Sequence, residues 1–150
     1  MEKFNEFAHL KGSLTIIHRK ADGSVETRRK DNLILNGGFD FIADAIGKAT
    51  GRPNVMSHIA VGTGTTAVAA TQTALVTELA RKAANYQHTA GTKIFTLTTT
   101  FNPGEATGAI TEAGVCNASN GGTFIDRVTF AVVNKAADDT VTMNFQFTLS

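Results

Sequence analysis

Histidines, one cysteine and a few carboxylates are the residues of this 150-residue chain that could carry catalysis or bind a metal ion. The histidines lack the paired spacing of a zinc site and stand at His9, His18, His58 and His88. Cys116 follows Val115 in an apolar segment, with no base beside it in the sequence to activate its thiol. Asp138 and Asp139 are more typical of a turn than of a calcium loop. The sequence therefore predicts no enzymatic activity, no cofactor and no metal.

For the charged residues elsewhere in the chain, the sequence leaves two alternatives: a structural role, or contact with a partner. Glu112 lies in an otherwise apolar segment, which predicts an interface residue or one half of a buried pair. Glu78 and Arg81 could pair on a helix but would lie on opposite faces of a strand. The basic groups 19–20 and 28–30 could face each other across a hairpin. They would then either bind an acidic partner or keep a solvated sheet edge from pairing.

A glycine-rich stretch in the middle of the chain is the candidate contact loop. An apolar strand is expected at 59–61, followed by a wide loop and a return into the sheet from 73 onward. The stretch lacks the lysine and the spacing of a phosphate-binding loop. Glycines permit close backbone approach, so we predict a protein contact here, at Gly62, Thr63, Gly64, Thr65 and Thr66.

Composition limits the classes of partner. With 14 Lys and Arg against 13 Asp and Glu, the net charge is +1, which does not indicate binding to nucleic acid or to an anionic membrane. No apolar run approaches the roughly 20 residues of a membrane-spanning helix. The charged N-terminus does not resemble a secretion signal, and one cysteine fits synthesis in a reducing cytoplasm.

Alternating apolar residues separated by turn residues predict an all-β domain. The alternation is clearest at Val141, Met143, Phe145 and Phe147. Asp22-Gly23 predicts a hairpin turn. We expect a jelly-roll-like antiparallel β-sandwich over residues 12–150, with strands at 13–18, 25–30, 32–35, 59–61, 78–89 (bent), 93–101, 109–117, 123–133 and 141–149.

One short α-helix is expected between Asn36 and Gly47. Asn36 would cap its N-terminus and Gly47 would supply the left-handed residue after its last turn. Phe39, Ile42 and Ile46 would share one face. The helix should therefore lie against a sheet or close one end of the sandwich.

Residues 1–11 are expected to form an N-terminal arm. Phe4, Phe7 and Leu10 recur at a spacing of three, which fits either an apolar stripe that packs on a neighbouring subunit or a cap on the chain's own sandwich.

Several segments together resemble a family of phage virion proteins. They are Phe-Asp-Phe-Ile-Ala-Asp at 39–44, Met-Ser-His-Ile-Ala-Val-Gly-Thr-Gly-Thr-Thr at 56–66, Thr-Ala-Leu-Val-Thr-Glu-Leu-Ala-Arg at 73–81, Ile-Thr-Glu-Ala-Gly-Val-Cys-Asn at 110–117 and Arg-Val-Thr-Phe-Ala-Val-Val-Asn-Lys at 127–135. With the last strand, they make the chain similar from about residue 11 onward to the capsid cement, or decoration, proteins of short-tailed phages. Related patterns also occur in proteins labelled as tail fibres.

The resemblance implies a jelly-roll-like fold and a non-enzymatic structural role. It implies a protein made in the cytoplasm of a bacterial host and located on the outside of the virion capsid. Its expected partners are the major capsid protein and further copies of itself, as a homodimer or homotrimer. The alternative is a tail fibre or tail adaptor protein that binds a receptor or a glycan.

Overall fold

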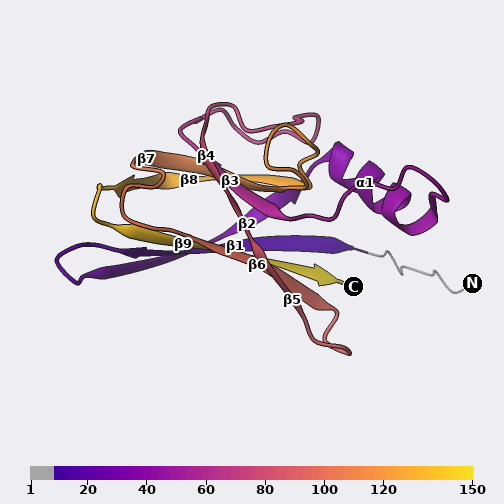
Figure 1. Cartoon of the computed structure of the whole chain (residues 1–150), viewed down its shortest axis with the longest axis horizontal. Helices are drawn as coiled ribbons and strands as arrows, with labels where there is room; N and C mark the ends of the chain where they lie inside the picture. The colour runs from indigo at the N-terminus through magenta and orange to yellow at the C-terminus, as the bar shows by residue number, and fades with distance from the viewer. Residues whose placement is uncertain (1–8) are drawn as a thin grey trace, which may run out of the picture.

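The computed structural model describes residues 9–150, which form nine antiparallel strands and one helix (Figure 1). The helix is α1 (Asn36–Gly47), and the strands are β1 (Leu10–Arg19), β2 (Val25–Ile34), β3 (His58–Gly62), β4 (Glu78–Ala83), β5 (Asn85–His88), β6 (Ile94–Phe101), β7 (Gly108–Cys116), β8 (Asp126–Lys135) and β9 (Thr140–Leu149). The prediction of an all-β domain with one short helix is confirmed. The two short strands expected at 25–30 and 32–35 are one continuous strand, β2.

All nine strands belong to one sheet, in the order β4-β3-β7-β8-β2-β1-β9-β6-β5. The sheet folds over on itself, so that β4, β3, β7 and β8 form one layer and the other five strands form the second layer. The two layers are joined where β2 pairs with β8, through only Leu33 with Arg127 and Ile34 with Asp126. This narrow seam makes the sandwich a single, nearly closed sheet.

The bent segment 78–88 nearly closes the sheet. Its first half, β4, pairs with β3 at one edge of the sheet, and its second half, β5, pairs with β6 at the other edge. At the bend, Thr99 Oγ1 donates to the backbone oxygen of Ala83 (2.9 Å), and Lys82 Nζ donates to that of Thr100 (2.9 Å). The prediction of a bent strand here is confirmed.

The core lies between the two layers and follows the alternation seen in the sequence. Val141, Met143, Phe145 and Phe147 of β9 are fully buried. The ring of Phe147 stacks on that of Phe95 in β6, with centroids 5.0 Å apart. Removing these side chains from water is the main driving force for the fold.

Helix α1 has the predicted bounds but not the predicted ends. Asn36 is its first residue rather than its cap, and Leu35 precedes it without a capping side chain. Gly47 is not left-handed; instead the extended Lys48 donates its N–H to Asp44. Phe41 and Ile42 pack on the core, whereas Ile46 of the predicted face is 80% exposed. The helix lies at the end of the sandwich where β1 begins and β9 ends (Figure 1).

Strand β1 begins at Leu10, two residues before the predicted start of the domain. It pairs with β9 from Leu10 opposite Leu149 onward. His9 continues the ladder by exchanging backbone hydrogen bonds with Ser150. Phe4 and Phe7 of the predicted arm lie outside the residues that the structure describes.

Candidate functional site

The base of the predicted contact loop is held by one buried carboxylate, that of Glu112 in β7. Its two oxygens accept backbone hydrogen bonds from three positions, which are Gly64 (3.0 Å), Val76 (2.9 Å) and Thr77 (2.7 Å). The segments before and after the loop are therefore fastened to the same side chain.

Arg127 of β8 completes this anchor. Its Nε donates to Glu112 Oε2 at 2.8 Å, and both side chains are fully buried. Its Nη1 donates to the backbone oxygen of Thr66 (2.9 Å) and to the side chain of Gln72 (3.0 Å). Burial alone would raise the pKa of Glu112, but the hydrogen bonds from Thr77, Val76 and Arg127 outweigh it and lower the pKa. Of the two alternatives for Glu112, the structure shows the buried pair.

Two glycines of the loop are required by this anchor. A Cβ on Gly62 would collide with the backbone oxygen of Thr77, and one on Gly64 would lie 2.5 Å from the Glu112 carboxylate. These glycines are buried, so of the five predicted contact residues only Thr65 and Thr66 are exposed, with Thr63 half-buried. The structure thus brings the predicted loop residues together, but only the tip of the loop is available for contact.

Leu10, the third predicted arm residue, lies at the rim of an apolar hollow of about 490 Å³. We call this space the apolar hollow. It lies between α1 and the end of the sandwich, and is lined among others by Phe41, Ile42, Ile46, Tyr86 and Leu149. Among residues 9–150, no charged side chain lines it. Leu10 and Leu149 also line a smaller neighbouring hollow, together with Phe39 and Lys93.

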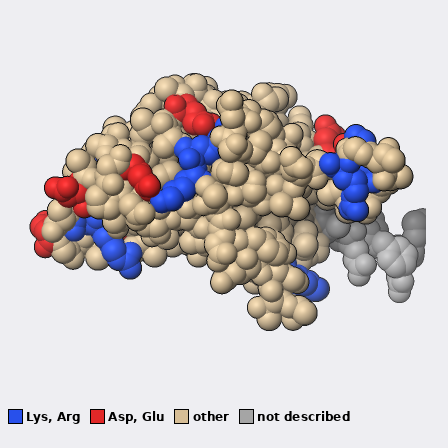
Figure 2. All heavy atoms as spheres, viewed as in Figure 1, with Lys and Arg blue, Asp and Glu red and all other residues tan. Residues whose placement is uncertain are grey.

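Exposed apolar side chains are concentrated around the apolar hollow. Ile46 is 80% exposed, Val55 75% and Tyr86 58%, and all three line it. Figure 2 shows charged side chains towards the end formed by the β1–β2 hairpin and on α1, and few over β5 and β6. The surface around the apolar hollow is therefore suited to contact with another apolar surface.

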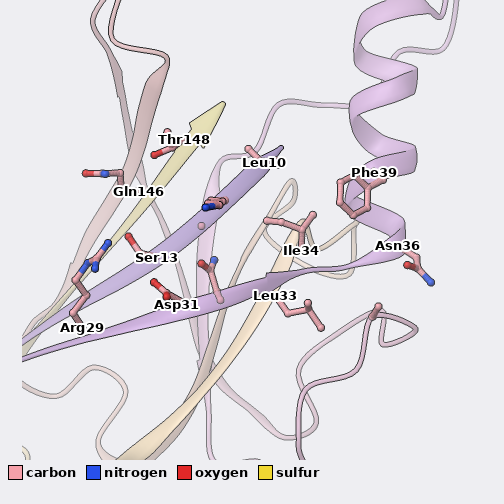
Figure 3. A pocket seen from close by; sticks show the side chains of 14 residues that line it. Leu10, Ser13, Arg29, Asp31, Leu33, Ile34, Asn36, Phe39, Gln146 and Thr148 are labelled. Carbon is pink, nitrogen blue, oxygen red and sulfur yellow. The ribbon is translucent and has the colours of Figure 1, made fainter. Parts of the chain in front are cut away.

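A second hollow, of about 670 Å³, is lined by both polar and apolar side chains and lies on the outer face of β2, β1 and β9 (Figure 3). Asp31, Ser13 and Gln146 stand in register across these three strands, and Arg29 lies beside them. Within residues 9–150, none of these four side chains has a hydrogen bond or ion pair. Phe39 of α1 forms one wall (Figure 3).

Of the histidines and the cysteine, His58 and Cys116 lie opposite each other on β3 and β7, where the thiol of Cys116 donates to the backbone oxygen of His58 (3.8 Å) rather than to its imidazole. Buried His18 bonds through Nε2 to Asp139 (2.8 Å), while His58 bonds to Ser57 and His88 to the backbone of Ile94. Cys116 is buried, and burial raises the pKa of its thiol. Within the part of the chain that the structure describes, no group of three His, Cys, Asp or Glu residues could hold a metal ion. No helix among these residues is long and apolar enough to cross a membrane.

Glu78 and Arg81 do pair, although they lie in a strand. Arg81 Nη2 is 2.6 Å from Glu78 Oε1, and Arg81 Nη1 donates to the backbone oxygens of Ala118 and Gly121. The guanidinium also lies over the ring of Phe124, 5.2 Å from its centroid. These contacts tie β4 to the 117–123 loop, a role that the spacing of the two residues could not predict.

Asp126 occupies the seam between the two layers and is fully buried. Its carboxylate accepts hydrogen bonds from the backbone of Val115 (2.8 Å) and from the side-chain amide of Asn32. Burial raises its pKa to about 7, because no cation in the described part of the chain is near enough to compensate for the lost hydration.

Comparisons with known proteins found no family model, no curated protein and no solved structure that matches this chain.

Proposed function

We propose that this chain is a non-enzymatic structural protein of a phage virion, which binds the major capsid protein from outside and cements the shell. The observation that carries the proposal is the exposed apolar surface around the apolar hollow. Exposing the neighbouring apolar side chains of Ile46, Val55 and Tyr86 to water costs free energy. Surfaces of this kind mark contacts between proteins. The resemblance of the sequence to capsid cement proteins supplies the class of virion protein.

The contact with the shell is assigned to the tip of the anchored loop, Thr65 and Thr66, together with the N-terminal residues Phe4, Phe7 and Leu10. Because Glu112 and Arg127 fix the base of the loop, little conformational entropy is lost when its tip binds. Self-association would place several such tips around a symmetry axis of the capsid, where identical contacts repeat. Many weak contacts on one shell then act together.

The test is binding of the purified protein to capsids that lack it. The double variant Thr65→Glu/Thr66→Glu is expected to fold normally but to lose most of its binding to the shell. Capsids treated with it should rupture as easily as untreated ones. Thr27→Glu is the matched control, because Thr27 is also exposed but lies on β2, remote in sequence from the loop. Density for the protein only at the tail, in cryo-electron microscopy of the virion, would contradict the proposal.

A tail fibre or tail adaptor protein that binds a glycan is the second candidate, and the second hollow, on the outer face of β2, β1 and β9, favours it. Its free carboxylate, amide and guanidinium groups beside an aromatic ring could bind sugar hydroxyls and a sugar face. Glycan binding by the isolated chain that is abolished by Asp31→Ala would support this candidate against cementing.

A further inference from the structure

The apolar hollow opens beside the point where residues 1–8 join the domain. His9 donates its N–H to Ser150 (2.6 Å) and accepts one from it (2.9 Å). The next residue, Leu10, lines the apolar hollow. The segment that precedes His9, Met-Glu-Lys-Phe-Asn-Glu-Phe-Ala, contains two large apolar residues, Phe4 and Phe7.

We propose that residues 1–8 of one copy dock, through Phe4 and Phe7, in the apolar hollow of a second copy, and that the two copies exchange these segments reciprocally. The exchange is isologous, so each copy both gives a segment and receives one. The inference names the partner in the self-association proposed above and rests on that proposal for its role in the virion. Phe4 and Phe7 then join the two copies, and the loop tip at Thr65 and Thr66 remains for the contact with the shell.

The direction of the chain favours a second copy over the chain's own hollow. The ladder with β9 holds the chain extended up to His9. Phe7 lies only two residues further, within about 7 Å of His9 along the chain. To enter its own hollow beside Leu10, the chain must reverse at once, and residues 1–8 contain neither Gly nor Pro for a tight turn. A segment that arrives from a facing molecule needs no reversal.

The buried area is sufficient for a stable dimer. A phenylalanine buries about 150–250 Å², so the four rings of two exchanged segments would bury roughly 600–1,000 Å² of their own surface. The surface of the two hollows is smaller than that of the four rings, so the total is about 1,000–1,400 Å², just above the roughly 1,000 Å² that a specific interface needs. The uncharged lining around Ile46 and Tyr86 suits these rings.

Disulfide trapping between two variants tests the exchange directly. Phe7→Cys and Ile46→Cys proteins are mixed in equal amounts and oxidised; the native Cys116 is buried and does not compete. We expect a covalent dimer on a non-reducing gel. Phe7→Cys mixed with Val25→Cys is the control, because Val25 is exposed at the opposite end of β1–β2. Only monomers from the first mixture would overturn the proposal, as would an intrachain disulfide in the double variant Phe7→Cys/Ile46→Cys.

Light scattering of the protein without added cysteines provides a second measurement. The wild type is expected at twice the mass of the chain, and the double variant Phe4→Ala/Phe7→Ala at the mass of one chain. Ile46→Glu should also give a monomer, whereas Val25→Glu should remain dimeric. A dimer that survives both Phe4→Ala/Phe7→Ala and Ile46→Glu would overturn the exchange. Capsids are absent from these experiments, so a dimer that fails to bind capsids would refute cementing and leave the exchange intact.

Discussion

Glu112 and Arg127 are the two residues on which the geometry of the contact loop depends. Glu112 could be singled out in the sequence because a carboxylate interrupts an apolar segment. Its partner could not, since the pairing joins positions 15 apart through the β7–β8 register. Gly62 and Gly64 predicted that the backbone approaches another group closely. In the structure that group is the carboxylate of Glu112, together with the backbone oxygen of Thr77 at Gly62.

Breaking the buried pair should be costly. Arg127→Met leaves the Glu112 charge buried without its cation, and we expect a loss of about 3–5 kcal/mol in the free energy of unfolding. The double variant Glu112→Gln/Arg127→Met should lose clearly less than the sum of the single losses, because it buries no unpaired charge. Urea denaturation of all four proteins measures the coupling.

Lys48→Met is the control for this cycle, because the pair of Lys48 with Asp44 is about half exposed. The free energy of unfolding of Lys48→Met should be within about 1 kcal/mol of that of the wild type. Additive losses in the Glu112 and Arg127 cycle would show that the two side chains are not coupled and that the loop is held in another way.

Helix α1 shows what hydrophobic periodicity can and cannot predict. The bounds were predicted from Asn36 and Gly47 as capping residues, and they are right although neither residue caps the helix as expected. The prediction that its apolar face would be covered was only partly right: Phe41 and Ile42 reach the core, but Phe39 and Ile46 remain exposed. Periodicity identifies a face that needs a partner, and it does not say whether residues 9–150 contain that partner.

The bent segment 78–88 is an element whose strand character was ambiguous in the sequence. Its two halves pair with strands at opposite edges of the sheet, and this depends on contacts at the bend. The hydroxyl of Thr99 is buried and donates to Ala83 at the end of β4. Local spacing does not encode such a contact, because the donor lies on another strand.

Thr99→Val should therefore weaken the closure. The substitution keeps the shape of the side chain but leaves the backbone oxygen of Ala83 without this donor, which should cost about 1–3 kcal/mol of unfolding free energy. Thr98→Val is the matched control, because the hydroxyl of Thr98 itself makes no hydrogen bond within the described residues. Equal stability of the two variants in urea would contradict a role of Thr99 in the closure.

At the scale of the whole molecule, the seam between β2 and β8 decides how the two layers hold together. Composition and alternation were enough to predict an all-β sandwich. The two layers are joined through only two residue pairs, and this depends on contacts between residues far apart in the sequence. Asn32 and Asp126, for example, are 94 positions apart. Asp126 gave no signal in the sequence, because it directly precedes Arg127 and looks like an ordinary surface residue. Its burial makes the seam sensitive to pH.

The pKa of Asp126 is raised from 3.8 in the unfolded chain to about 7 in the fold. Between these values the folded state holds a proton that the unfolded state has lost, so stability falls as the pH rises from about 4 to about 7. Asp126→Asn should remove this loss and be more stable than the wild type at pH 8, by up to roughly 4 kcal/mol. The new amide could also donate to Asn32 Oδ1, which is buried without a partner among the described residues.

The measurement is urea denaturation of both proteins from pH 4.5 to pH 8. Groups with lowered pKa values, such as Asp139, are common to both and cancel in the difference. A stability difference that stays constant over this range would mean that Asp126 is ionised throughout and that the seam does not titrate.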